Sequence, residues 1–292
     1  MDRTMGLGEF LRTRRARLLP ADVGVEPRGR RRVPGLRREE LARLAGVSVD
    51  YYTRLEQGRS HNASPEVLEA IADALRLDET ERTHLLDLAC PPVPARHRRP
   101  EPPQRVRPET HQLLDTLHRA GAPAFVVGRR CEILAQNALF RGMASEYDLD
   151  SLPARERNAA LLIFLHPRAR HLHPDWEQVT EGVVAMLRFE FGRHPDDPLL
   201  GELIEELWAR SGPFRLLWAN HDVHERVVGT KRYNHPVVGM FTVTYQTLTL
   251  PGVPDQTLYV YTVEPGTPSA DALRELAAWV EKGSCPLADE AS

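Results

Sequence analysis

Residues 38–58 are Arg38-Glu-Glu-Leu-Ala-Arg-Leu-Ala-Gly-Val-Ser-Val-Asp-Tyr-Tyr-Thr-Arg-Leu-Glu-Gln-Gly58, a pattern typical of two short helices that cross at a fixed angle. Ala42 allows the helices to approach closely, and Gly46 permits the tight turn between them. Ser48 is a good N-cap for the second helix. We therefore expect helices over 38–44 and 49–57.

The outer face of the second helix is the candidate functional surface. Val47, Tyr52 and Leu55 are spaced to pack against the first helix, which leaves the other side in solvent. In a helix-turn-helix this side enters the major groove of DNA, while the start of the preceding helix grips phosphate. The candidate DNA-binding residues here are Arg38, Ser48, Val49, Asp50, Tyr51, Thr53, Arg54 and Arg59. An ordinary helical hairpin in a bundle is the alternative.

A basic segment precedes this pair of helices. We expect its arginines to lie along a phosphate backbone or in a neighbouring minor groove; they are Arg28, Arg30, Arg31, Arg32 and Arg37. Residues 1–59 hold 14 arginines and 8 acidic residues, a net charge of +6, whereas the whole chain has −3. A polyanionic partner therefore suits only this front part. A solvated charged loop is the alternative.

Apolar periodicity and cap residues predict three further helices in this region, over 7–18, 64–75 and 78–89. From Cys90 to Pro108 the chain contains seven prolines and five arginines, which is typical of a stiff, extended linker. The sequence thus predicts a five-helix DNA-binding domain over 1–90, a linker over 91–108 and a second domain over 109–283.

The second domain mixes the two periodicities. Segments rich in Val, Thr, Tyr and Phe predict strands, over 124–128, 131–136, 214–220, 237–248 and 257–264. Amphipathic segments predict helices, over 137–145, 158–164, 175–191, 199–211 and 271–281. Because strands stand at both ends with helices between them, we expect an α+β fold, one antiparallel sheet with helices on one face.

The segment 38–58 resembles the helix-turn-helix of the Xre-type regulators, and the resemblance extends into the second domain. There the chain is similar to the MmyB-like transcription regulators, helix-turn-helix proteins with a PAS-like ligand-binding domain. The matching stretches are Ile133–Asn137, Asp175–Glu177, Val184–Arg188, Leu207–Ser211, Leu217–Val223, Gly229–Lys231, His235–Gly239 and Tyr261–Gly266. The resemblance implies a cavity for an acyl chain or a similar apolar small molecule, and hence a fatty-acid-like effector.

Large apolar side chains are the candidate walls of that cavity. They are Phe125, Ile133, Phe140, Phe164, Trp176, Phe214, Trp218 and Tyr245, although such residues at helical or strand spacing also form plain cores. A fatty acid needs one or two polar anchors, for which Asn137, Arg188 and His235 are the candidates. The alternative roles are a helix cap for Asn137, a surface ion pair for Arg188 and a backbone hydrogen bond for His235.

Other classes of function find little support. Cys90, Cys131 and Cys285 lie far apart and form no CxxC pair, which argues against zinc ribbons and redox motifs. The histidines near Asp175 (His166, His171 and His173) and those near Asp222 (His221 and His224) lie in segments that we expect to be surface loops, so we predict no metal site. The sequence shows no complete set of catalytic acid, base and nucleophile, so we predict neither an enzyme nor a cofactor.

These observations predict a cytoplasmic regulator that binds double-stranded DNA. It has neither a signal-peptide core nor an apolar stretch of membrane-spanning length. One small module covers one half-site, so we expect a homodimer. The alternative is a regulator whose C-terminal domain only dimerises or binds a protein partner, without a small-molecule effector.

Overall fold

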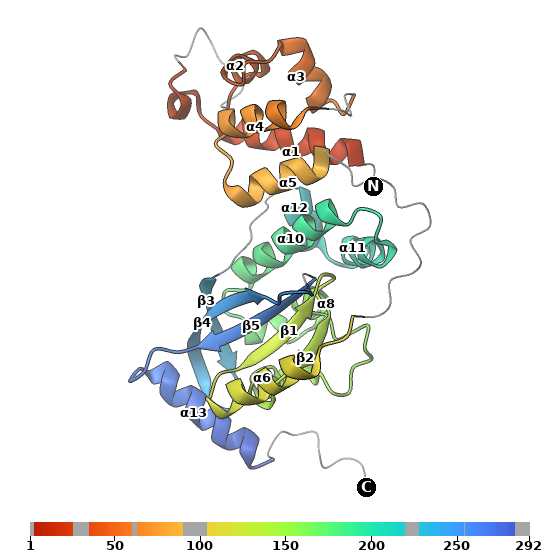
Figure 1. The fold of residues 1–292 in the computed structure, drawn as a ribbon. Coiled ribbons are helices and arrows are strands. Elements are labelled where there is room, and N and C mark those ends of the chain that lie inside the picture. The colour runs from red at the N-terminus through yellow and green to blue at the C-terminus, as the bar shows by residue number, and fades with distance from the viewer. Residues whose placement is uncertain are drawn as a thin grey trace. The chain divides into compact units, whose positions relative to one another are not determined.

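The computed structural model of the chain describes residues 3–25, 35–59, 63–89, 104–219, 228–253 and 255–283. It divides into two compact units. The first unit comprises Met1–Pro100 together with Arg188–Asp197 and Leu216–Glu225, and the second comprises Glu101–Leu187, Pro198–Arg215 and Arg226–Ser292. Figure 1 shows helices in the N-terminal region and a sheet with helices in the rest of the chain.

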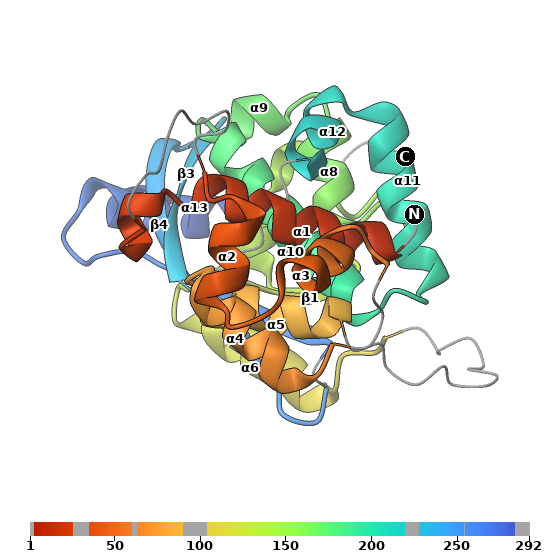
Figure 2. The ribbon, with the colours of Figure 1, turned by 90° about the horizontal axis from the view of Figure 1, so that it is seen from above.

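All five helices predicted for the N-terminal region form. They are α1 (Arg3–Arg17), α2 (Arg38–Leu44), α3 (Val49–Glu56), α4 (Pro65–Ala74) and α5 (Glu79–Ala89), with a short 3-10 helix at Pro20–Val23. Helix α3 packs against α1 and against α2, and Figure 2 shows the three helices from above. Their shared core is fully buried and includes Phe10, Leu11, Leu41, Tyr52, Leu55, Leu68, Ile71 and Leu85.

The predicted cap residues explain where these helices begin. The Ser48 hydroxyl accepts a hydrogen bond from the backbone N–H of Tyr51 at 3.1 Å, which satisfies a donor at the start of α3. Asp78 and Glu81 form a reciprocal capping box at the start of α5, with bonds of 3.1 and 2.8 Å. The starts of α3 and α5 are thus encoded by side chains next to them in the sequence.

An antiparallel sheet forms the centre of the second unit. Within the described residues its strands are β1 (Ala124–Gly128), β2 (Ile133–Gln136), β3 (Val228–His235), β4 (Gly239–Thr249) and β5 (Gln256–Thr262), in the order β2-β1-β5-β4-β3. Phe125 of β1 stands opposite Tyr259 of β5, and Tyr233 of β3 stands opposite Phe241 of β4. Aromatic side chains are therefore concentrated across the middle of the sheet.

Further helices lie in the chain after α5. They are α6 (Pro108–Arg119), α7 (Ala138–Met143), α8 (Ala159–Leu165), α9 (Ala169–Leu172), α10 (Trp176–Arg193), α11 (Pro198–Arg210), α12 (Gly212–Ala219) and α13 (Pro268–Glu281), with a 3-10 helix at Ser145–Tyr147. Phe125 and Val127 face a large core that includes residues of α7, α8 and α13. Ala124 and Val126 face the other way, toward Leu114 of α6. The α+β prediction is confirmed, and α6 adds a helix on the second face.

The prediction of a strand over 214–220 is wrong, because these residues lie largely in α12. Ser211 caps this helix, since its hydroxyl accepts a hydrogen bond from the backbone N–H of Phe214 at 3.2 Å. Phe214 and Trp218, four residues apart, are both buried, which is the spacing of one helical face. The segment has no alternation of exposed and buried residues that would favour a strand.

Three elements were missed: α6, α9 and β3. Pro108, the last residue of the predicted linker, occupies the first turn of α6, where its missing N–H costs nothing. Strand β3 was not predicted because its sequence, Val-Gly-Thr-Lys-Arg-Tyr-Asn-His, is mostly polar. Residues 91–103 of the predicted linker lie outside the described residues. None of the described helices is both long and apolar enough to cross a membrane.

Candidate functional site

The outer face of α3 is open to solvent. Tyr52 and Leu55 point into the core and are fully buried, as predicted. Val49 is 47% exposed, and the side chains of Asp50 and Arg54 lie mostly in solvent. Tyr51 and Thr53 are partly buried. Val49, Asp50 and Arg54 thus lie on a side of α3 that no described part of the chain covers, while Tyr51 and Thr53 are covered in part.

Arg54 and Asp50 form an exposed ion pair one helical turn apart, with Nε 3.5 Å from Oδ2. Such pairs contribute little to stability, since solvent screens them. The Arg54 guanidinium lies beside Asp50 on the exposed face of α3. An arginine in this place is suited to a bidentate contact with guanine.

Glu56 connects three helices of this unit. Its carboxylate is 1% exposed and accepts hydrogen bonds from Nε and Nη2 of Arg15, both at 2.9 Å, and from Nε of Arg38 at 2.9 Å. Burial alone would raise the pKa of Glu56, but the two guanidinium groups outweigh it and hold the pKa below its ordinary value. Arg38 is therefore partly engaged within the protein, while it remains exposed enough to meet phosphate.

The remaining predicted phosphate contacts are placed only in part. Arg37 lies beside Glu39, with its Nη1 3.5 Å from the carboxylate, and Arg59 is exposed after the end of α3. Arg28, Arg30, Arg31 and Arg32 lie outside the described residues. The side chains that the structure does place here, Arg37, Arg38 and Arg59, are all basic and all partly or fully exposed.

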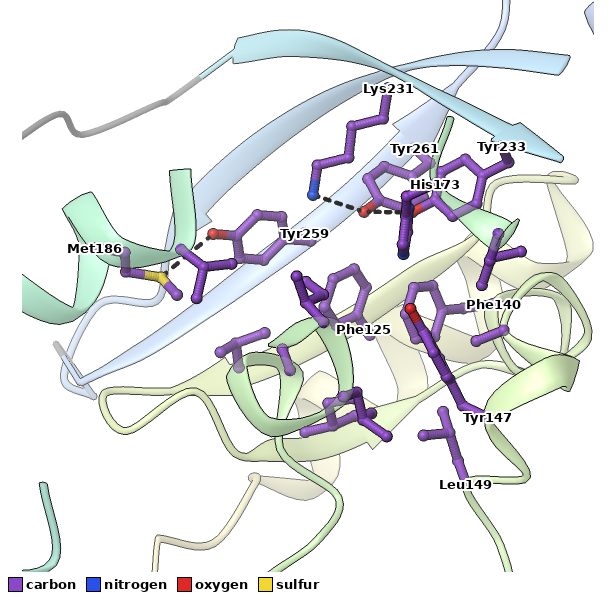
Figure 3. Close-up of a pocket in the computed structure, with 18 residues that line it drawn as sticks. Phe125, Phe140, Tyr147, Leu149, His173, Met186, Lys231, Tyr233, Tyr259 and Tyr261 are labelled. Atoms are coloured by element: carbon purple, nitrogen blue, oxygen red, sulfur yellow. Dashed lines mark hydrogen bonds between the residues drawn. The ribbon is translucent and has the colours of Figure 1, made fainter. Parts of the chain in front are cut away.

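The second unit contains a cavity between the sheet and the helices packed on its larger core (Figure 3). The volume of the cavity is about 80 Å³. Among the described residues its wall consists of Phe125, Val127, Ile133, Phe140, Ala144, Tyr147, Leu149, Ala159, Leu162, Ile163, Leu172, His173, Val183, Met186, Lys231, Tyr233, Tyr259 and Tyr261. Most of this wall is apolar, with a small number of polar groups.

Three of the predicted apolar residues line the cavity: Phe125, Ile133 and Phe140. Phe125 and Phe140 stack at 3.9 Å between ring centroids. The other predicted apolar residues are not among the lining residues, and they pack in cores. The Trp176 indole N–H donates to the Ile163 carbonyl at 2.8 Å, and Phe164 meets Phe214 edge to face at 5.2 Å.

Trp218 is buried and lies near Phe191, and Tyr245 lies beside Tyr259 and Tyr261 in the sheet. Their large apolar surfaces are buried without contact with the cavity, which is the plain-core role that the sequence left open.

The predicted polar anchors have structural roles. Asn137 caps α7 by accepting from the N–H of Phe140 at 2.9 Å, and its amide donates to the Ala122 carbonyl at 2.8 Å. Arg188 donates to the Trp218 carbonyl and lies over the Trp218 ring. The His235 ring lies within 3.0 Å of the Gly142 carbonyl and 3.1 Å of the Ser145 hydroxyl. Each side chain satisfies backbone groups rather than lining the cavity.

A different set of polar residues faces the cavity: Tyr147, His173, Lys231, Tyr233 and Tyr261 (Figure 3). We call this set the polar cluster. The Lys231 ammonium lies 3.5 Å from the Tyr261 hydroxyl, and the Tyr233 hydroxyl donates to that of Tyr261 at 3.1 Å. The His173 ring lies 5.0 Å from the Tyr233 ring and 6.2 Å from the Tyr147 ring.

The protonation states in the polar cluster follow from burial. Burial and the positive charge of Lys231 lower the pKa of His173 to about 3, so the ring is neutral at pH 7. Burial raises the pKa of the Tyr147, Tyr233 and Tyr261 hydroxyls, so they stay protonated. The cluster combines one ammonium with neutral O–H and N–H groups.

Sequence reasoning missed the polar cluster, yet a signal was present. Lys231 and Tyr233 alternate on β3, and Tyr259 and Tyr261 alternate on β5, so that each pair shares one face of the sheet. Had β3 been predicted, this period of two would have placed Lys231 among the tyrosines.

The histidines singled out in the sequence do not form a metal site in the described part of the chain, where no group of three suitable ligands occurs. The expectation of a surface loop is wrong for two of these histidines. His171 belongs to α9, and its ring lies 2.9 Å from the Glu146 carboxylate. His173 is buried and lines the cavity. His221, Asp222 and His224 lie outside the described residues.

Two protein families match parts of this chain. Residues 106–276 match the family described as the MmyB-like transcription regulator ligand binding domain. Residues 7–85 match the family described as a helix-turn-helix domain. A search of curated proteins found no match.

Proposed function

Because this chain belongs to the MmyB-like transcription regulators, we propose that it acts as a homodimer that binds specific DNA sequences under the control of a fatty-acid-like effector. DNA binding and a ligand-binding domain belong to the family assignment. The proposal adds the residues that contact DNA, the homodimer and the class of effector.

The exposed face of α3 is the observation that carries the proposal. It presents Val49, Asp50 and Arg54 on a helix whose opposite side is anchored by Tyr52 and Leu55. A short, well-anchored helix with an unobstructed N-terminal half is what the major groove accepts. Arg54 supplies base preference there, whereas Arg37, Arg38 and Arg59 contact phosphates and add salt-dependent affinity.

The cavity favours a small-molecule effector over the alternative of a domain that only dimerises or binds a partner. A purely structural domain would be expected to have a filled core, whereas here the largest core surrounds an apolar space with a few polar groups. An effector in that space shifts the balance between conformations that differ in affinity for DNA.

A selection of bound duplexes from a random pool, done with and without a fatty acid, tests the proposal. We expect a sequence with two half-sites about one helical turn, roughly 34–36 Å, apart, and a change in the recovered amount when the fatty acid is present. The Arg54→Ala variant should recover a broader set of sequences. Recovery of unenriched pool DNA by the wild-type protein would contradict DNA specificity.

The homodimer has a separate test, since DNA specificity does not depend on it. Light scattering of the purified protein alone should give the mass of two chains. With the selected duplex it should give the mass of two chains and one duplex. A single chain in both conditions would refute the dimer and leave the assignment of α3 intact.

A further inference from the structure

Strands β3 and β4 turn only one of their two faces toward the large core. Tyr233, Phe241 and Tyr245 are buried there, and the side chains that alternate with them point the opposite way. Helix α6 packs on that second face over β1 and β5, through Leu114, whereas β3 and β4 lie at the far side of the sheet from β2 (Figure 1). The side chains in question, which we call the outer face, are Val228, Thr230, Arg232, Asn234, Met240, Thr242, Thr244, Gln246 and Leu248.

The outer face exposes more apolar surface than a solvated strand needs. Val228 is 58% exposed, Met240 is 54% exposed and Leu248 is 48% exposed. Between them Thr230 stands opposite Thr244 across the two strands. Threonine and valine side chains have few rotamers to lose and pack well on a pleated surface. These residue types therefore suit a face that becomes covered.

The outer face also carries almost no charge. The 22 residues between Arg232 and Asp255 include no Asp, Glu, Lys or Arg, although these types make up 27% of the chain. The charge of Arg232 is balanced, since its Nε donates to Oδ2 of Asp175 at 2.6 Å. Depletion of charged residues distinguishes the centre of a protein–protein interface from the rest of a protein surface.

The charge of the surrounding chain indicates which partner fits this face. Residues 100–292 hold 26 acidic and 19 basic residues, a net charge of −7. Two copies of this region repel each other over most of their surfaces, and they meet at the lowest electrostatic cost through an uncharged face. In a twofold dimer one face meets itself, so it has to match its own charge pattern. The outer face does so.

The size of the outer face sets the strength of such a contact. Strand β4 has 11 residues, so the face is about 37 Å long, and two strands are about 10 Å wide. This is a small face, at the low end of specific interfaces. We therefore expect a reversible dimer with a dissociation constant on the order of 1–10 μM. A duplex with two half-sites then favours pairing, because it binds both copies at once.

We propose that two copies of this chain pair through the outer face of β3 and β4, sheet against sheet. This inference rests on the homodimer of the proposed function, and it adds the surface at which the copies meet. Sheets that pack face to face lie about 10 Å apart with their side chains interdigitated. The threonines and apolar side chains of the two copies would fill that layer.

Sedimentation velocity of the full-length protein over a range of concentrations tests the inference. Thr244 lies near the middle of the outer face, between Thr230 and Thr262 of the neighbouring strands. Thr244→Glu and Thr244→Lys each place like charges against each other in the dimer, so each should raise the dissociation constant at least about tenfold. An equimolar mixture of the two variants should pair again, because opposite charges then meet. A folding defect would not be rescued by mixing.

Two further substitutions serve as controls. Gln178→Glu and Gln178→Lys make matching charge changes at an exposed position of α10, a helix whose Trp176 packs in the core on the other side of the sheet. Both should pair as the wild-type protein does. Gln246→Glu keeps the size of an exposed side chain on the outer face, so it should weaken pairing without disturbing β4. Circular dichroism of each variant checks the fold.

The outcomes separate the inference from the homodimer on which it rests. If the variants of Thr244 and Gln246 pair as tightly as the wild-type protein, the inference is overturned and a dimer with another interface remains. The same conclusion follows if the mixture of Thr244 variants pairs no better than either variant alone. If the wild-type protein is a single chain at every concentration and on the selected duplex, the homodimer itself is refuted, and the inference with it.

Discussion

Glu56 joins three helices of the DNA-binding unit through hydrogen bonds. It accepts hydrogen bonds from Arg15 of α1 and Arg38 of α2 while it belongs to α3. Glu56→Gln leaves two guanidinium groups facing a neutral amide in a buried place, and we expect a loss of about 3–5 kcal/mol in the free energy of unfolding. Urea denaturation followed by circular dichroism measures it.

Glu39→Gln is the control for this prediction. Glu39 lies on the neighbouring helix α2, and its side chain is mostly exposed, so its loss should change stability by less than about 0.5 kcal/mol. Equal losses of stability for the two substitutions would show that the buried hydrogen bonds of Glu56 do not stabilise the unit.

Arg54 is expected to provide base preference rather than general affinity. Arg54→Ala should cost about 1–3 kcal/mol on the selected sequence and relax the preference at one base position. Binding titrations on the selected duplex and on single-base variants measure both effects. Arg12→Ala, an exposed arginine on α1, should leave the preference unchanged; a uniform loss across all duplexes for Arg54→Ala would assign Arg54 to phosphate instead.

His173 makes the second unit sensitive to acid. Its folded pKa of about 3 lies below the ordinary 6.5, owing to burial and to Lys231, so the unfolded chain takes up the proton first as the pH falls. The contribution of His173 to stability is complete above pH 6.5 and is lost toward pH 3, at about 1.4 kcal/mol per pH unit. Unfolding by urea at pH 7 and pH 5 should therefore differ by about 2 kcal/mol.

His173→Gln should reduce this difference, because glutamine does not titrate. Some pH dependence will remain, since burial also lowers the pKa of His166 and His235. The same loss between pH 7 and pH 5 in the variant and the wild-type protein would mean that His173 is not the source.

At the scale of elements, one asparagine joins three of them. The Asn137 carbonyl oxygen accepts from the N–H groups of Phe140 and Ala124, at 2.9 and 3.2 Å, and its amide donates to the Ala122 carbonyl that follows α6. Asn137→Ala removes the cap of α7 and leaves buried backbone groups unsatisfied, so we expect a loss of about 2–4 kcal/mol. Thermal unfolding of the variant measures it.

Ser48→Ala is the matched comparison, as it also removes a helix cap. Ser48 is exposed and bonds only one backbone N–H among the described contacts, so we expect a loss of about 1 kcal/mol. A cost for Asn137→Ala no larger than that for Ser48→Ala would contradict the view that Asn137 holds α6, β1 and α7 together.

The elements that were mispredicted share a physical cause. Residues 214–220 form a short apolar segment, and such a segment has no period that distinguishes a buried strand from a buried helix. The burial of Phe214 and Trp218 on one face favours the helix α12. Strand β3 is mostly polar, and its pairing with β4 over the register Val228–Gln246 to His235–Gly239 decided its structure.

At the scale of the whole molecule, binding of an effector should stabilise the second unit, and tryptophan fluorescence can follow the unfolding of that unit. Three of the four tryptophans, Trp176, Trp208 and Trp279, belong to the second unit. An effector at 100 times its dissociation constant should raise the free energy of unfolding of that unit by about 2.7 kcal/mol. Urea denaturation followed by tryptophan fluorescence, with and without decanoic acid, measures the shift.

Lys231→Met provides the control for this experiment. Lys231 lines the cavity, so a variant that binds the acid tenfold more weakly should show a smaller shift, about 1.4 kcal/mol at the same acid concentration. A shift as large as that of the wild-type protein would place the acid elsewhere in the molecule.

The sequence by itself determined the helices of the N-terminal region and the exposed face of α3 that we propose to bind DNA. Helix periods, caps such as Ser48 and the turn at Gly46 act between near neighbours, so 38–58 already specifies which side of α3 is exposed. Only the tertiary structure decided which polar groups face the cavity. Tyr147, His173 and Lys231 come from three separate segments, whereas the anchors expected from the sequence, Asn137, Arg188 and His235, bind backbone groups. Such convergence depends on strand pairing and side-chain packing between distant residues, which no local pattern encodes.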